Sequence, residues 1–231
     1  MASGSLDYRI VSIGTLAAHP LWNESVEVRT GHATTTLISI DSAHILVNPS
    51  LPAAALLARL SERSPVRPDE ITDVFLTSAD RDHRRALPLF ENARWLAAEP
   101  ELETARADLT IRQDEAAGDA ELVEMLSHDL KILRKCTPAP DRLYRGVDLF
   151  PLPGVTPGCC GLLLSLPRAT VLVCGDAVAT REHLEQGKVL PSCFNVEQAQ
   201  ESFGEAVQIA DLLIPGRDNI SLNPLRQPGG F

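Results

Sequence analysis

Three apolar segments of the chain end abruptly in short polar turns, and this arrangement restricts the fold more than any other feature. The segments are "VFLTSADRDH" at 74–83, "TVLVCGDA" at 170–177 and "DLLIPGRDN" at 211–219, and a related turn, "PLPGVTPGC", occupies 151–159. Such runs are typical of buried strands whose ends carry reactive side chains into a pocket on a rigid scaffold. The pattern therefore predicts a sheet-based fold in which residues far apart in sequence share one site.

Strands and helices follow one another along the rest of the chain. Apolar and β-branched runs predict strands at 8–16, 33–40, 43–48, 71–77, 93–98, 147–152, 160–166, 169–174 and 211–215. Apolar residues at three- and four-residue spacing predict helices at 54–63, within the charged stretch 101–135, and at 196–209. This order predicts two sheets sandwiched between helices.

Composition narrows the class of protein. A chain of 231 residues can bury a large core in one domain, which we expect at 6–231 after a flexible leader at 1–5. The 31 acidic and 21 basic residues give a net charge of -10, which disfavours a nucleic-acid partner. The sequence shows no secretion signal and no apolar run long enough to span a membrane, and its five cysteines include no CxxC pair. We therefore expect a cytoplasmic protein without a membrane partner, and its oligomeric state stays open.

The four turns together resemble the hallmarks of the metallo-β-lactamase superfamily. That family carries T-H-x-H-x-D-H after a strand, then a P-G-H-T-P-G turn, a G-D-A after a later strand and a final P-G-H. The matching segments here occur in the same order between about Val28 and Asn219, and the chain is similar in length to the short MBLAC-type hydrolases. The resemblance implies an α/β fold, an αβ/βα four-layer sandwich with its site at one edge between the sheets. It also implies hydrolysis by a hydroxide held between two metal ions, usually zinc.

Residue by residue, the resemblance carries over only part of the metal-ligand set. Asp82 and His83 match the D-H pair of the second metal, and Asp176 matches the carboxylate that bridges both metals. Ser78 and Asp80 stand at the first two histidine positions. The implied remaining ligands are therefore Asp82, His83 and Asp176, with Asp80 as a possible addition.

Two further histidine positions of the family are also substituted. Val155 stands at the last histidine of the first metal and has no lone pair, and Arg217 puts a permanent cation at the last histidine of the second metal. We expect both side chains to line the pocket with Ser78 and Asp80. The expected cofactor is either none or one divalent ion, Zn, Mn, Mg or Fe, and two zinc ions are not expected.

The repulsion between the clustered carboxylates defines the alternatives for how the site is neutralised. Three carboxylates brought together repel one another, by about 4 kcal/mol for a pair 4 Å apart at an effective dielectric of 20. A proton, a metal ion or the guanidinium of Arg217 can relieve this repulsion. Our first hypothesis is that Arg217 replaces the lost metal charge, which predicts a hydrolase homologue that is catalytically impaired or silent, a pseudoenzyme.

Two alternatives stay open at this point. The first is an active single-metal hydrolase of ester, thioester or phosphodiester substrates, with Asp80, Asp82, His83 and Asp176 as ligands and Asp82 as a possible general base. The second is a non-catalytic interaction scaffold.

Several charged and titratable residues flank the motif. Arg81, Arg84 and Arg85 could attract a small anionic substrate or ligand. His32 and His183 could each enter the pocket from a loop.

Overall fold

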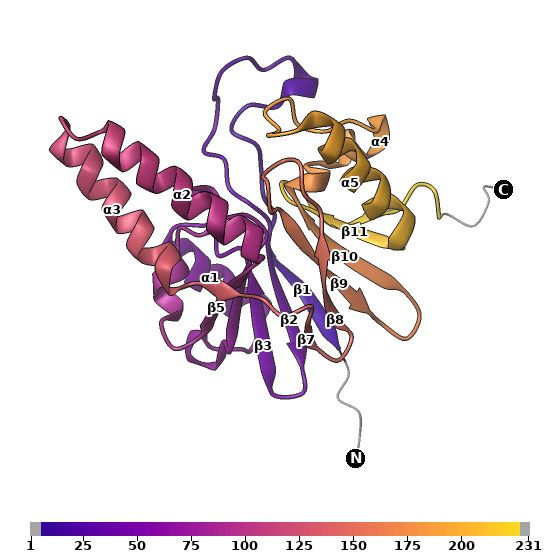
Figure 1. Cartoon of the computed structure of the whole chain (residues 1–231). Helices are drawn as coiled ribbons and strands as arrows, with labels where there is room; N and C mark the ends of the chain where they lie inside the picture. The colour runs from indigo at the N-terminus through magenta and orange to yellow at the C-terminus, as the bar shows by residue number, and fades with distance from the viewer. Residues whose placement is uncertain (1–5, 227–231) are drawn as a thin grey trace.

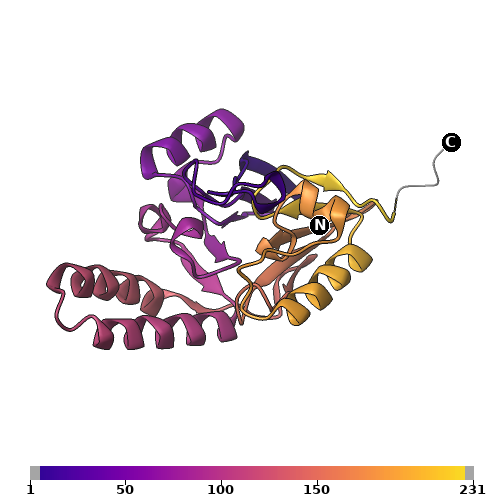
Figure 2. The same ribbon diagram turned by 90° about the horizontal axis from the view of Figure 1, so that it is seen from above.

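Two six-stranded sheets face each other and carry helices on their outer faces (Figures 1 and 2). This arrangement comes from a computed structural model that describes residues 6–226. In the first sheet the strands follow the order of the chain: β1 (Asp7–Ser12), β2 (Thr35–Ile40), β3 (Ala43–Val47), β4 (Asp73–Leu76), β5 (Arg94–Ala97) and β6 (Thr137–Pro138). The predicted leader at 1–5 lies outside the described residues.

The second sheet is built from the later part of the chain. Its spatial order is β12-β11-β10-β9-β8-β7, and its strands are β7 (Arg142–Tyr144), β8 (Val147–Pro151), β9 (Cys160–Ser165), β10 (Thr170–Gly175), β11 (Leu212–Pro215) and β12 (Ser221–Leu222). Strands β10 and β11 are parallel, as are β3, β4 and β5.

Within residues 6–226, five α-helices cover the sheets. Three pack on the first sheet and two on the second: α1 (Ala53–Arg63), α2 (Glu99–Glu115), α3 (Ala120–Lys135), α4 (Arg181–Gln186) and α5 (Val196–Ile209). Helices α2 and α3 form a hairpin that extends away from the sheets (Figure 1). No helix within residues 6–226 is long and apolar enough to cross a membrane.

Alternating side chains divide the core into three layers. On β10, Val171 and Val173 point between the two sheets, whereas Leu172 points outward under α5. On β4, Phe75 likewise faces the other sheet, and Leu76 faces the helices of its own sheet. A strand that is covered on both faces reads as a continuous apolar run. The predicted four-layer α/β sandwich is therefore confirmed.

The structure differs from the predicted elements mainly where elements are short. The charged stretch at 101–135 forms two helices, α2 and α3, with the turn between them at 116–119. Strands β6, β7 and β12 and helix α4 were not predicted, because two to six residues carry too little periodicity to be recognised.

Gly154 fixes the turn that packs against α5. Its φ is +127°, and a Cβ there would overlap the backbone nitrogen of Ala199 near the start of α5. Both the backbone conformation and the space therefore require glycine.

We predict that Gly154→Ala lowers the free energy of unfolding by at least about 2 kcal/mol, because strain and overlap add. Gly204→Ala is the matched control, since Gly204 lies within α5 with open space at its Cβ position. That variant should gain up to about 1 kcal/mol. Urea unfolding of both variants measures the difference, and equal stabilities would contradict the prediction.

Candidate functional site

The candidate site lies where loops from both sheets meet at one edge. Asp82 and His83 follow β4 in the first sheet, Asp176 follows β10, and Arg217 follows β11. Because parallel strands end at the same edge of a sheet, the turns after β10 and β11 are neighbours. The fold thus brings together side chains that are up to 135 positions apart.

Arg217 is the centre of this cluster. Its Nε donates to Oδ1 of Asp176 at 2.8 Å and its Nη2 to Oδ2 at 2.6 Å, a bidentate ion pair. Its Nη1 donates to Oδ2 of Asp82. The residue is only 8% exposed and Asp176 only 6%. One buried cation therefore pairs with two carboxylates, one from each sheet.

His83 completes the cluster. Its Nε2 lies 2.9 Å from Nη2 of Arg217 and 3.2 Å from Oδ2 of Asp176. Nδ1 lies 3.3 Å from Oγ1 of Thr77. The fully buried imidazole therefore links the cluster to the end of β4.

Asn48 holds the loop after β4 in place. It follows β3 with a φ of +50°, a conformation that asparagine tolerates better than most residues. Its Oδ1 accepts from the backbone nitrogen of Thr77 and its Nδ2 donates to Oγ1 of Thr77, both at 2.9 Å. These two buried hydrogen bonds fix the position at which the loop after β4 leaves the sheet.

The acidic groups of the cluster are ionised against the effect of burial. Burial alone would raise the pKa of Asp176, but the neighbouring Arg217 and His83 hold that pKa well below its usual range. For Asp82, burial is likewise outweighed by His83 and Arg217, so its pKa is lowered. The same pairing raises the pKa of Arg217 above its ordinary value despite its burial.

The substituted positions have different surroundings. Ser78 is buried, and its hydroxyl accepts from the backbone nitrogen of Asp80 at 3.2 Å. Val155 lines the cavity above the cluster. Asp80 is solvent-exposed; among residues 6–226 its carboxylate has no hydrogen-bond or ion-pair partner, and partial desolvation by the surrounding loops raises its pKa.

Glu101 is a site residue that sequence reasoning missed. This buried residue of α2 accepts from the backbone nitrogen of Ala79 at 2.8 Å, from Oγ1 of Thr156 at 2.7 Å and from the backbone nitrogen of Gly158 at 3.2 Å. It therefore joins the loop after β4 to the turn at 151–159. Glu101 occurs in a stretch rich in charged residues, and no pattern in the sequence distinguishes it from the neighbouring residues that face solvent.

Asp129 of α3 engages two of the three arginines near the motif. It accepts from Nε of Arg81 and, at 3.1 Å, from Nη1 of Arg84. Of the predicted arginines, Arg85 has no such partner within residues 6–226 and lines the cavity. The attraction of an anionic ligand stays a prediction.

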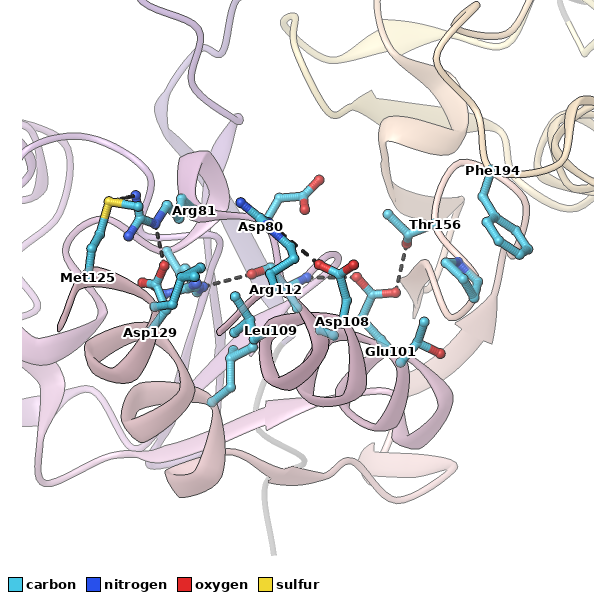
Figure 3. Close-up of a pocket in the computed structure, with 17 residues that line it drawn as sticks. Asp80, Arg81, Glu101, Asp108, Leu109, Arg112, Met125, Asp129, Thr156 and Phe194 are labelled. Atoms are coloured by element: carbon cyan, nitrogen blue, oxygen red, sulfur yellow. Dashed lines mark hydrogen bonds and ion pairs between the residues drawn. The ribbon is translucent and has the colours of Figure 1, made fainter. Parts of the chain in front are cut away.

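Two adjoining cavities open beside the loop after β4. The larger, of about 830 Å³, lies over Asp82, Asp176 and Arg217. The smaller, of about 360 Å³, lies between the loop after β4 and the α2–α3 hairpin, as Figure 3 shows. Asp80, Arg81, Arg112 and Thr156 line both.

A long segment between β1 and β2, residues 13–34 and here called the strap, forms one wall of the larger cavity. His19 anchors it: its Nε2 lies 3.2 Å from Oγ1 of Thr180, and its ring stacks on Trp22 at 4.1 Å. His183 lies 5.3 Å from that ring and is fully buried beneath the strap, outside both cavities. His32 is bound to the strap backbone instead of lining a cavity.

The residues present do not fit a pair of metal ions. Three of the family's histidine positions hold Ser78, Asp80 and Val155, and valine cannot ligate. The guanidinium of Arg217 contacts Asp82, His83 and Asp176, the donors that the resemblance assigns to the second metal. Within residues 6–226 no group of three or more His, Cys, Asp or Glu side chains is arranged to hold a metal ion. In this arrangement the guanidinium occupies the donor atoms that a second metal would need.

Comparison with known proteins agrees with this architecture. The sequence profile described as the Metallo-beta-lactamase superfamily matches residues 28–215. The chain belongs to the metallo-beta-lactamase superfamily. The predicted family is therefore confirmed, and it is a family of hydrolases. No curated protein matches the chain.

Solved structures of this superfamily share the fold. AidC, a dizinc quorum-quenching lactonase, aligns with a TM-score of 0.73 at 16% identity, covering 99% of this chain and 94% of that one. Bacillus thuringiensis AiiA, with N-decanoyl-L-homoserine bound at its active site, aligns with a TM-score of 0.62 at 18% identity, covering 94% of each chain. The hydrolase AbOPH aligns with a TM-score of 0.61 at 13% identity, covering 98% of this chain and 94% of that one. At these identities the likeness establishes the fold alone.

We predict that Arg217→Met lowers the free energy of unfolding by about 3–5 kcal/mol, because it leaves Asp82 and Asp176 together without a cation. Arg217→Lys should lose less, since it keeps the charge but not the bidentate geometry. Urea unfolding at neutral pH measures both variants. A methionine variant as stable as the parent would contradict the assigned role.

The burial of His183 makes the stability of the folded protein depend on pH. Burial, aided by the neighbouring His19, lowers the pKa of His183 from 6.5 to about 4. The unfolded chain therefore binds this proton at higher pH than the folded chain, and stability falls as the pH drops from about 6.5 to 4. We predict that His183→Asn reduces this fall by on the order of 2 kcal/mol, measured by urea unfolding across that range.

His128→Asn, at an exposed histidine of α3, controls for the loss of one imidazole. An identical pH profile in the His183 variant and the parent would show that burial of His183 does not matter.

Proposed function

We propose that this protein is a metal-free member of the superfamily that has lost metal-activated hydrolysis and retains a ligand-binding pocket. The observation that carries the proposal is the position of Arg217, whose guanidinium contacts Asp82, Asp176 and His83. Those are the groups that the resemblance assigns to metal binding. The internal cation supplies the charge that the fold needs at this edge.

A guanidinium preserves the charge of a metal but not its chemistry. A metal ion lowers the pKa of its bound water and accepts an electron pair from a substrate oxygen. A guanidinium has no vacant coordination position, and it can only donate hydrogen bonds. The cluster can therefore hold the loops together without generating a hydroxide.

Asp82 is a weak candidate for a general base in this arrangement. Its pairing with Arg217 and the neighbouring His83 lower its pKa, and a less basic carboxylate removes protons less effectively. The general-base role from the sequence therefore stays a prediction that this geometry disfavours. The pocket itself persists, since Asn48 and Glu101 hold its loops through protein groups alone.

The metal content of the purified protein tests the proposal. Untagged protein prepared without added zinc should contain less than about one tenth of an equivalent of Zn, Mn, Mg or Fe. A content near one equivalent would favour the single-metal hydrolase with Asp80, Asp82, His83 and Asp176, and it would overturn the proposal. The same sample is assayed against ester, thioester and phosphodiester substrates with and without a chelator, and no chelator-sensitive activity is expected.

Arg217→His is the complementary variant. It removes the internal cation and offers an imidazole beside Asp82, His83 and Asp176, so it should bind about one metal ion more than the parent. Failure of this variant to take up metal would show that Arg217 is not what keeps metal out.

A further inference from the structure

The two cavities form an adjoining pair with different linings. The smaller one combines charged side chains with an apolar part of its wall, which comes from the loop after β4, the α2–α3 hairpin and the turn at 151–159: Ala79, Ala105, Leu109, Leu126, Leu133 and Pro157. Figure 3 shows Met125 and Phe194 at opposite ends of this cavity, with Asp80 and Arg112 between them. A cavity that offers both apolar wall and placed polar groups can hold a small molecule.

Most of the charges around both cavities are already paired. Every lining arginine except Arg85 has a carboxylate partner within the described chain, in the pairs Arg29 with Glu24, Arg81 and Arg84 with Asp129, Arg112 with Asp108, and Arg217 with Asp82 and Asp176. Arg81 and Arg84 share one carboxylate, but the six lining arginines are outnumbered by eight lining carboxylates.

The inner surface keeps an excess of negative charge. Asp80 lies in the wall shared by the two cavities, and within residues 6–226 its carboxylate oxygens have no partner. Glu101 lies nearby, and its donors are the uncharged groups of Ala79, Thr156 and Gly158. A negative group entering between these carboxylates would be repelled, whereas a cation would gain an ion pair.

We propose that the adjoining cavities bind a small molecule with an apolar body and a cationic nitrogen, its body in the smaller cavity and its nitrogen on the carboxylate of Asp80. This inference rests on the proposed metal-free site, because a metal-bound Asp80 would not be available to a ligand. It departs from the anionic ligand suggested by the sequence, since Asp129 engages Arg81 and Arg84.

Three probes with similar bodies and different head groups test the charge preference. Calorimetric titration compares 2-phenylethylamine, 3-phenylpropanoate and 3-phenyl-1-propanol on chelator-treated protein. The amine should bind about tenfold more tightly than the other two. Tighter binding of the carboxylate would overturn the inference in favour of an anionic ligand, and the absence of saturable amine binding would also overturn it.

Two variants test where in the cavities the amine probe binds. Asp80→Asn should weaken amine binding about tenfold and leave the alcohol unchanged, because only the ion pair is lost. Ala105→Leu should weaken both, since it fills the apolar cavity. The matched control is Asp114→Asn, which removes the same charge from an exposed position of α2 outside both cavities.

Circular dichroism confirms that each variant is folded before titration. Unchanged amine affinity in the Asp80 variant would overturn the inference. Metal content is measured on the parent before chelation: about one equivalent of metal would overturn the proposed function, whereas a metal-free protein without amine preference would overturn only this inference.

Discussion

The contact between Arg217 and two carboxylates from different sheets is the interaction on which the site depends. Asp82 extends from the first sheet and Asp176 from the second, and both are held by one guanidinium. Without a cation between them, these charges would repel each other and separate the loops at this edge. AidC, which has a similar fold, is a dizinc protein, and under the proposed function Arg217 supplies the cation in this chain instead.

The two solutions differ in what else they permit. A metal neutralises carboxylates and also activates water, whereas a guanidinium only neutralises and orients. Its attachment to the chain also makes the local concentration of the cation independent of the surroundings. The cluster is therefore part of the folded protein, and Gly216 belongs to it, because a Cβ there would overlap Oδ1 of Asp176.

The pocket is held by buried polar groups that do not need a metal. Asn48 fastens the loop after β4, and Glu101 joins that loop to the turn at 151–159. Each of these buried groups is satisfied by several hydrogen bonds, and such networks rigidify the segments they connect. A shaped cavity can thus persist without a bound metal ion, as the proposed function requires.

The sequence by itself determined the layers and the location of the site. Continuous apolar runs such as 170–174 specify strands buried on both faces, and the ordered turns specify which loops meet. The sequence also showed directly that valine occupies position 155 and arginine occupies position 217, where the family has histidine. Only the tertiary structure decided that the guanidinium of Arg217 takes both carboxylates while Asp80 has no partner. It also decided that Asp129 engages Arg81 and Arg84, and that the buried Glu101 joins two loops through hydrogen bonds. These outcomes depend on distances between loops from separate sheets and helices, and local sequence patterns carry no information about such distances.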